Sequence, residues 1–261
     1  MANDSATGWN GPIISVVPLA SAEPLALLRA AGSPLEVKLR GPRALLDQKD
    51  LKCCVSCALA ACLEVLHAGY AQLSALFHYA MTVAPNPQDA VDLTNGMTPE
   101  EGFAALYHQG ICSFEKHPYP FRSPEAKTKP NQAAIDDALP RAVTELDFAT
   151  YLPYFQPIGL AIDPVNECKK CLQQGNPLLF GIYLTANWGA AKLDSPGART
   201  GSRHAVACLG YSDLEASFII QDSFGPGHGR GGQWWLPYQS FVSSEPIVFS
   251  AHAVGYNLGR S

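Results

Sequence analysis

One stretch near the start of the chain is apolar on nearly every side. Residues 54–67 read CVSCALAACLEVLH, with many alanine, leucine and cysteine residues and no proline or glycine. Alanine and leucine favour helix, and a helix without a polar face has to be covered by other elements. We therefore expect a buried helix here. The length of 261 residues allows one large domain or two lobes, each with its own core.

The elements around this stretch change character along the chain. Residues 35–40 alternate apolar and polar side chains like a half-buried strand, and Ser74 begins a second helix. A third helix runs to Gly110 and starts at Thr98, where Pro99 takes the first position and Glu101 completes a capping box. The second half is expected to contain short strands at 177–184, 204–211, 217–221 and 233–236. Helices followed by strands indicate an α+β fold with segregated lobes.

The domain boundaries follow from these patterns. Residues 1–34 are rich in proline, alanine and serine, which predicts an irregular N-terminal arm. One domain is expected over 35–261, with a helical lobe at about 45–125 and a strand-rich lobe at about 150–261. Two polar segments, 122–150 and 186–203, are predicted to be loop-like insertions within it.

Composition and charge exclude several classes of protein. Hydrophobic residues make up 47% of the chain and the formal net charge is −5, which is not typical of intrinsic disorder. The same charge gives no basic surface for nucleic acid or an anionic membrane. No apolar run approaches the ~20 residues that a membrane-spanning helix requires. We therefore expect neither nucleic acid nor a membrane as a partner, and the sequence does not indicate an oligomeric state.

The first residues of the chain bear on its location. Asn3 and Asp4 stand where a secretory signal would carry positive charge, and Pro12, Pro18 and Pro24 interrupt the apolar stretches. We predict a cytoplasmic protein whose cysteines are mostly thiols. Export routes without a cleaved signal exist, so that alternative stays open.

Eight cysteines are the unusual feature of the composition. Nucleophilic catalysis by cysteine needs a thiolate, a histidine that shuttles its proton, a group that orients the histidine, and donors for the oxyanion. Cys54 stands at the head of the expected buried helix, where the positive end of the helix dipole stabilises a thiolate. Gln48 precedes it in a polar turn from which the amide could reach the same point.

The chain resembles the papain-like cysteine peptidases, and most closely the bacterial members. The segment 47–60, DQKDLKCCVSCALA, is similar to the pattern around their nucleophile. Further segments that resemble the family follow in the same order along residues 35–245: 73–79, the cleft segment 95–99 with 105–119, the histidine strand 201–211, and Asp222-Ser-Phe-Gly225 in place of Asn-Ser-Trp-Gly. His204 follows Cys54 by about 150 residues, within the family's usual spacing.

The resemblance implies a two-lobe papain-like fold with the active-site cleft between a helical lobe and an antiparallel β-rich lobe. It implies that Cys54 is the nucleophile, His204 the general base and acid, Asp222 the orienting group, and Gln48 an oxyanion donor together with the Cys54 backbone N–H. Six residues are expected to contact substrate: Asn95, Gly96, Met97, Arg203, Ala205 and Phe224. The expected substrate is a peptide, a protein or a small amide or acyl compound, and no cofactor or metal is expected.

Three other readings of these residues stay open. The string Cys54-Val-Ser-Cys57 also fits the family's Cys-Gly-Ser-Cys pattern with Cys57 as nucleophile, although Leu51 would then replace the oxyanion glutamine. The sequence also departs from the family where Met97 replaces a glycine. The same acyl-enzyme could therefore serve an acyltransferase or amide-forming enzyme of a biosynthetic pathway, and the chain could also be an inactive binding relative.

The remaining candidate residues have plainer interpretations. Cys57 and Cys62 are expected to be buried filler on the helix, and Cys168 and Cys171 two half-exposed thiols on another helix, because no second CxxC completes a zinc site. A disulfide between the adjacent Cys53 and Cys54 is a less favoured alternative. His228 lies in the glycine-rich segment 225–232 and is expected in a solvated loop, with a place on the leaving-group side of the cleft as the alternative.

Overall fold

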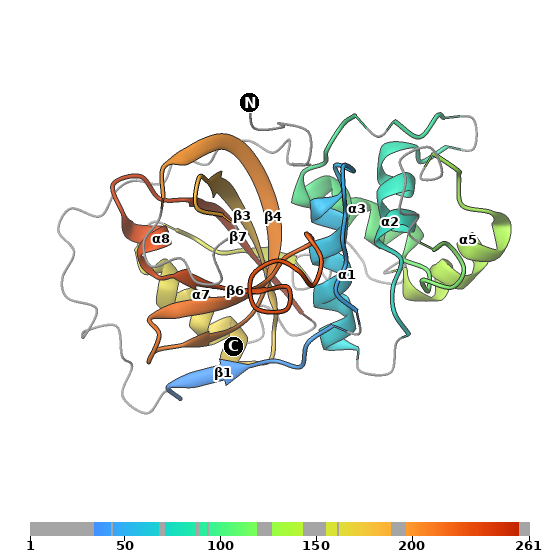
Figure 1. Ribbon diagram of the computed structural model, residues 1–261. Coiled ribbons are helices and arrows are strands. Elements are labelled where there is room, and N and C mark those ends of the chain that lie inside the picture. Colours follow the sequence, from blue (N-terminus) through green and yellow to red (C-terminus); the bar gives the residue numbers. More distant parts are fainter. Residues whose placement is uncertain are drawn as a thin grey trace.

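In the computed structural model, one side of the molecule is helical and the other contains an antiparallel sheet with further helices packed on it (Figure 1). The structure describes residues 34–42, 44–67, 71–86, 89–92, 94–118, 127–142, 155–160, 162–188 and 197–255. The α+β two-lobe fold expected from the sequence is confirmed. The predicted N-terminal arm lies outside the described residues except for Pro34, and the predicted domain bounds stay predictions.

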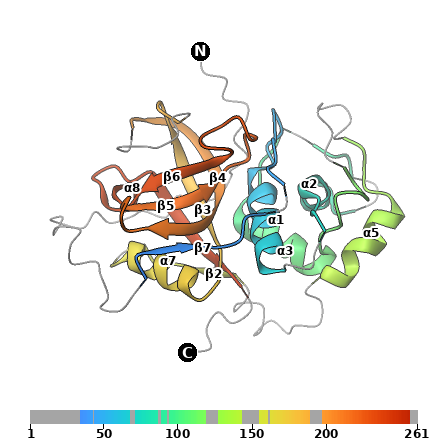
Figure 2. The same ribbon diagram turned by 60° about the horizontal axis from the view of Figure 1, so that its bottom comes forward.

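Within the described ranges, the helical side contains four helices and a short 3-10 helix, which gather together in Figure 2. They are α1 (Cys54–Leu66), α2 (Ala75–Val83), α3 (Pro99–Gln109), α5 (Gln132–Ala138) and η3 (Leu139–Arg141). None of the helices in the described ranges is both long enough and apolar enough to cross a bilayer.

The other side contains the sheet and, in the part of the chain that the structure describes, two helices. The strands are β1 (Glu36–Lys38), β2 (Phe155–Pro157), β3 (Leu178–Thr185), β4 (Arg199–Ser212), β5 (Ser217–Gln221), β6 (Gln233–Pro237) and β7 (Val248–Val254), and the helices are α7 (Pro164–Gln173) and α8 (Gln239–Val242). The strand order is β2-β7-β3-β4-β5-β6. The short β1 pairs with the last residues of β4, past the point where Leu178 at the start of β3 pairs with Cys208. All these pairs are antiparallel.

Local capping explains where two of the helices start. Ser74 accepts a hydrogen bond from the Phe77 backbone at the N-terminus of α2. At α3, Thr98 and Glu101 form the reciprocal capping box that the sequence predicts. Helix α3 ends at Gly110, whose φ of 68° is a conformation that favours glycine.

Helix α1 lies between the sheet and the other helices of its lobe (Figures 1 and 2). Its residues are buried from Cys54 through Glu64, as expected of a helix without a polar face. Alternate residues of β4 face different cores. Ala205 and Ala207 pack with α1, whereas Val206 and Cys208 pack with α7 and α8 on the opposite face of the sheet. The sheet therefore separates two hydrophobic cores.

Two predicted loops contain regular structure. The segment 122–150 includes α5 and η3, because Asn131 caps α5 and Ala134 and Ala138 bury its inner face. The loop predicted at 186–203 extends too far, because strand β4 already begins at Arg199. Arg199 pairs with Thr185, next to a bulge in β3. Both errors arise because the polar composition of these segments hides contacts with distant parts of the chain.

Candidate active site

Cys54 is the first residue of α1, at the end of the helix that adjoins β4. The preceding Cys53 is the N-cap residue, and its side chain does not cap the helix backbone. Both cysteines are buried. The positive end of the helix dipole lies at this end of α1.

His204 is a buried residue of β4 whose ring is fixed on one edge by Asp222. Its Nε2 atom lies 2.9 Å from Oδ1 of Asp222, and both side chains are fully buried. Its Nδ1 atom has no nitrogen or oxygen partner among the described residues. Burial opposes the charged imidazolium, but the hydrogen bond to Asp222 and the interaction with Cys54 outweigh it and raise the pKa of His204 to about 10. The histidine is therefore held as a cation between a carboxylate and a thiol.

Asp222 follows β5 and is held by several donors. Besides His204, Oδ1 accepts a hydrogen bond of 2.7 Å from the backbone of Ser223. Oδ2 accepts one of 3.0 Å from the indole Nε1 of Trp188. Sequence reasoning missed Trp188, which lies in the segment 186–203 predicted as a loop. Nothing in its local sequence pointed to Asp222, which is 34 residues away.

Phe224 covers the imidazole of His204. The two rings are stacked with centroids 4.7 Å apart and an angle of 6° between their planes. His228 also packs against Phe224, with ring centroids 5.3 Å apart, and is half-buried rather than solvated as predicted. The aromatic ring excludes water from the histidine and lowers the local dielectric constant around the contact with Asp222.

Gln48 is joined to the same segment through its backbone and its side chain. Its backbone N–H donates to the Ser223 carbonyl at 2.7 Å, and its Oε1 accepts from the Ser223 hydroxyl at 2.5 Å. Its Nε2 atom donates to the carbonyl of Leu51 at 2.7 Å. A bridge between Asp47 and Phe224 continues the pairing. The turn before α1 is therefore anchored beside the residues that contact His204.

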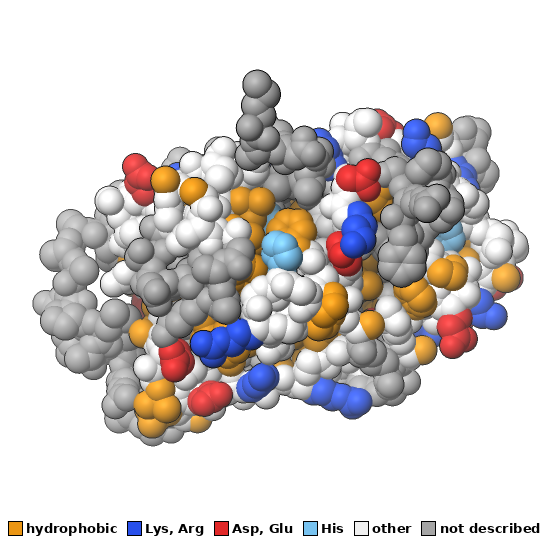
Figure 3. Space-filling model, viewed as in Figure 1, with side chains coloured by type: hydrophobic (Ala, Val, Ile, Leu, Met, Phe, Trp, Pro, Cys, Tyr) orange, Lys and Arg blue, Asp and Glu red, His pale blue; other side chains and the backbone are white. Residues whose placement is uncertain are grey.

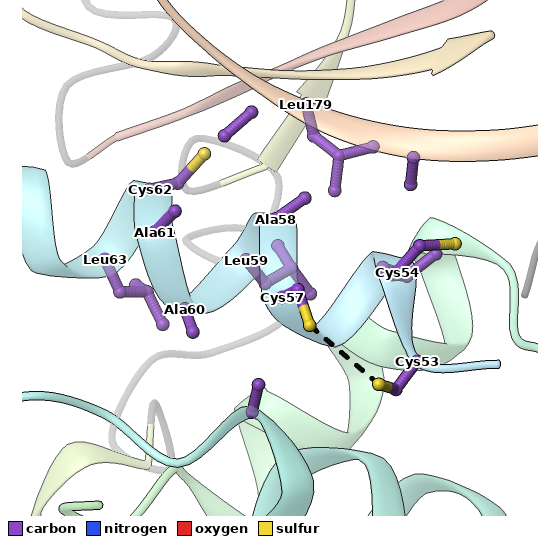
Figure 4. Packing of buried hydrophobic residues seen from close by; sticks show 14 of the residues in the cluster. Cys53, Cys54, Cys57, Ala58, Leu59, Ala60, Ala61, Cys62, Leu63 and Leu179 are labelled. Atoms are coloured by element: carbon purple, nitrogen blue, oxygen red, sulfur yellow. Dashed lines mark hydrogen bonds between the residues drawn. The ribbon is translucent and has the colours of Figure 1, made fainter. Parts of the chain in front are cut away.

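The alternative nucleophile Cys57 is directed toward Cys53 (Figure 4). Its sulfur lies 3.8 Å from that of Cys53 on the side of α1 opposite to the sheet, whereas the Cys54 side chain lies on the side of Leu179 (Figure 4). The contact with Cys53 and burial raise the pKa of Cys57 well above its ordinary value. Of Cys54 and Cys57, Cys54 is the one whose interaction raises the pKa of His204.

The residues expected to contact substrate differ in their placement. Asn95 is exposed and its carbonyl accepts from Tyr79 at 2.6 Å. Gly96 and Met97 are buried, and the Met97 sulfur lies 3.6 Å from the Ser56 hydroxyl, so its side chain points into the helical core. The other three are Arg203, half-buried on β4, Ala205, buried against α1, and the half-buried Phe224. Their substrate contacts stay predictions.

The other cysteines follow the plainer interpretation in most respects. No disulfide joins any of the eight, all of which lie in described residues. Cys62 is buried on α1 as expected. The prediction for Cys168 is wrong, because it faces the core under the sheet and is fully buried, while Cys171 on the same helix is half-buried. Within the described ranges, no cluster of three or more His, Cys, Asp or Glu side chains could hold a metal ion.

The face seen in Figure 3 has hydrophobic side chains in its middle, where the sheet adjoins the helices in Figure 1, with a histidine among them. Lysine, arginine, aspartate and glutamate side chains of the described residues are scattered around this area without forming a patch of one sign.

Comparison with solved structures identifies the fold. The chain aligns with xylellain, a cysteine protease from Xylella fastidiosa, with a TM-score of 0.74 and 22% identity over 96% of both chains. It aligns with a Carica candamarcensis cysteine protease in complex with E-64 with a TM-score of 0.64 and 14% identity, over 86% of this chain and 100% of the other. Procathepsin L 3 of Tenebrio molitor gives a TM-score of 0.65 at 14% identity, over 97% and 76% of the two chains.

Sequence comparison gives a weaker similarity of the same kind. No family model matches the chain. A peptidase C1-like protein of Acanthamoeba polyphaga mimivirus is 21% identical over 169 residues, which are 62% of this chain and 52% of the relative. The chain thus spans about half the length of this curated relative. The structural matches extend over both the helices and the sheet, and they show that this chain has the fold of the papain-like cysteine proteases.

Proposed function

We propose that this protein is a cysteine peptidase that cleaves peptide or amide bonds through an acyl-enzyme on Cys54. The observation that carries the proposal is the arrangement of Cys54 at the start of α1, His204 on β4, and Asp222 at 2.9 Å from Nε2 of His204. An Nδ1 atom without a nitrogen or oxygen partner among the described residues is left for the thiol. These are the parts that thiol hydrolysis requires.

The proposed reaction uses one proton on His204. The Cys54 thiolate attacks the carbonyl carbon of the substrate and forms a C–S bond, while the carbonyl electrons move to the oxygen. The imidazolium of His204 then gives its Nδ1 proton to the leaving nitrogen, and the C–N bond breaks. In the second half, His204 removes a proton from water, the resulting hydroxide attacks the thioester, and the C–S bond breaks. Release of the acid restores the thiolate and imidazolium.

Gln48 and the backbone N–H of Cys54 supply the donors for the oxyanion in this proposal. The Gln48 side chain is held by Ser223 at Oε1 and by the Leu51 carbonyl at Nε2, so its amide cannot turn freely. A donor that is already oriented costs little reorganisation when charge develops on the substrate oxygen. An amide nitrogen carries two N–H groups, and in this proposal Gln48 Nε2 donates to the oxyanion as well as to Leu51.

The first experiment compares Cys54→Ala and His204→Ala with Cys57→Ala on a mixed peptide library. Loss of the nucleophile or the base is expected to reduce kcat/KM by at least about a thousandfold. Cys57→Ala is the matched control on the same helix and is expected to retain activity. Mass mapping after brief treatment with iodoacetamide should locate the label on Cys54. Labelling of Cys57, with loss of activity in Cys57→Ala, would show that the nucleophile is misassigned.

A second measurement separates hydrolysis from acyl transfer. The buried Met97 stands where the family pattern has a glycine, so substrate binding on that side differs from the pattern. Products are analysed with and without a competing primary amine. A peptidase is expected to give mainly the free acid in both cases. Products formed only when the amine is present would favour the acyltransferase alternative, and no reaction with any acyl donor would favour the inactive relative.

A further inference from the structure

The carboxylate of Asp222 is buried, and its two oxygens accept hydrogen bonds from different partners. Oδ1 accepts from His204 and from the Ser223 backbone, at 2.9 and 2.7 Å. Oδ2 accepts from the Trp188 indole N–H at 3.0 Å. The side chain has no exposed surface, so its charge depends on these protein donors rather than on water.

Trp188 is fixed in the direction from which it donates. Its backbone N–H donates to the Thr185 carbonyl at 3.0 Å, which closes a turn directly after β3. Its indole stacks on the buried Trp234 of β6, with centroids 5.1 Å apart and planes 20° from parallel. The ring therefore enters the site from a segment other than those that carry Cys54, His204 and Asp222.

The indole N–H of Trp188 favours aspartate over asparagine at position 222. An indole can only donate a hydrogen bond. A carboxylate accepts at both ends, so it can bind His204 with one oxygen and Trp188 with the other. The resembled family pattern has asparagine at this position, and an amide has one donor end and one acceptor end. If the amide oxygen faces His204, its NH₂ group meets the Trp188 N–H; if the amide is turned, its NH₂ group meets the N–H of His204.

We propose that Trp188 is a positioning residue of the catalytic centre, and that its indole N–H fixes residue 222 as an aspartate that accepts from His204. The inference deepens the proposed function and rests on it for the role of His204. Trp188 acts through Asp222 and does not touch the reacting atoms. Without the indole N–H, Oδ2 loses the donor that the structure gives it, and the carboxylate can rotate away from Nε2.

The test is a double-mutant cycle with Trp188→Phe, Asp222→Asn and the double variant. Phenylalanine keeps an aromatic ring against Trp234 but cannot donate. Two rates are measured: kcat/KM on peptides, and alkylation of Cys54 by iodoacetamide at neutral pH. Trp188→Phe is expected to lower both about tenfold, and Asp222→Asn to lower them further. The double variant is expected to be as fast as Asp222→Asn or faster, because the clash between two donors is removed.

The control is Trp235→Phe, a tryptophan on β6 that packs with Arg230 and is half-buried. It is expected to leave both rates unchanged. The inference is overturned if Trp188→Phe alkylates at the wild-type rate, or if the loss in the double variant equals the product of the two single losses. The alkylation rate needs no peptide substrate, so it decides the role of Trp188 even if Cys54→Ala shows that the proposed peptidase function is wrong.

A measurement on Asp222→Asn covers the case in which Trp188→Phe does not fold. Hydrogen exchange of the Trp188 indole N–H is followed by NMR in the wild type and in Asp222→Asn. The bonded N–H of the wild type is expected to exchange slowly, and the variant to exchange at least about tenfold faster. Equal exchange in the two proteins would show that the hydrogen bond to Asp222 does not hold the ring, and the inference would fail.

Discussion

We predict that the helical lobe loses stability as the pH falls, because His78 is buried in it as a neutral side chain. His78 lies on α2, with Nε2 at 2.6 Å from the Gly102 carbonyl on α3 and Nδ1 at 2.8 Å from the Ser56 hydroxyl on α1. A carbonyl can only accept, so Nε2 carries the proton and Nδ1 accepts from Ser56 in the neutral ring. The residue is fully buried and links the three helices next to Cys54.

The size of the effect follows from the pKa of His78. Burial lowers this pKa from 6.5 to about 4, and the hydrogen bond to Gly102 only partly opposes it. The unfolded chain therefore binds the proton first as the pH falls, so the stability is fully present above about pH 6.5 and is lost toward pH 4. The full difference corresponds to about 3 kcal/mol. Between about pH 7 and pH 5 the loss is about 2 kcal/mol.

The assay is chemical unfolding of the wild type and His78→Gln over this range of pH. Glutamine is uncharged and can still donate and accept, although its hydrogen bonds will be less favourable. The wild type is expected to be more stable at neutral pH and to lose this advantage by about 2 kcal/mol near pH 5. His252 on β7, whose pKa burial also lowers to about 4, leaves a residual dependence in the variant. A difference between the two proteins that does not change with pH would refute the reasoning.

Two further predictions concern the stability of each lobe. Gly110→Ala is expected to lower the free energy of unfolding by at least about 2 kcal/mol in denaturant titrations, because φ is 68° and the new Cβ would lie 2.2 Å from a backbone oxygen. Gly175→Ala, with φ of 85° and open space, should cost about 1 kcal/mol, and equal losses would contradict the argument. Lys169→Met is expected to cost about 3–5 kcal/mol, because it leaves the Asp213 carboxylate without its buried partner at 2.7 Å. Restoration of stability by adding Asp213→Asn would support this cause, and an unchanged melting temperature in Lys169→Met would contradict it.

The elements predicted best are those that local interactions specify. The capping box at Thr98 and Glu101, the N-cap at Ser74 and the apolar helix at 54–67 all depend on residues a few positions apart. Helix α7 and strand β7 received no predicted bounds. Their residues are stabilised by the sheet and the core beneath it, and those contacts join parts of the chain that are far apart in sequence.

The candidate site divides in the same way. The resemblance to papain-like peptidases pointed to Cys54, His204, Asp222 and Gln48, and the structure brings His204 together with Asp222 and anchors Gln48 through Ser223. The direction of the Met97 side chain and the burial of Cys168 did not follow from the sequence. Both depend on which face of a helix or loop packs against a neighbouring element. The pattern of residues in one sequence does not specify that face.

The sequence by itself determined the buried helix, the N-terminal caps of the two helices that follow it, and the order of the residue types that thiol chemistry needs. Only the tertiary structure decided between Cys54 and Cys57 as the thiol beside His204, and only it brought the Trp188 indole to Asp222. The physical reason is the separation along the chain of the residues that interact. Helix formation and capping act within one or two turns of chain, whereas a catalytic hydrogen bond needs a direction and a distance that only the packed sheet and helices impose.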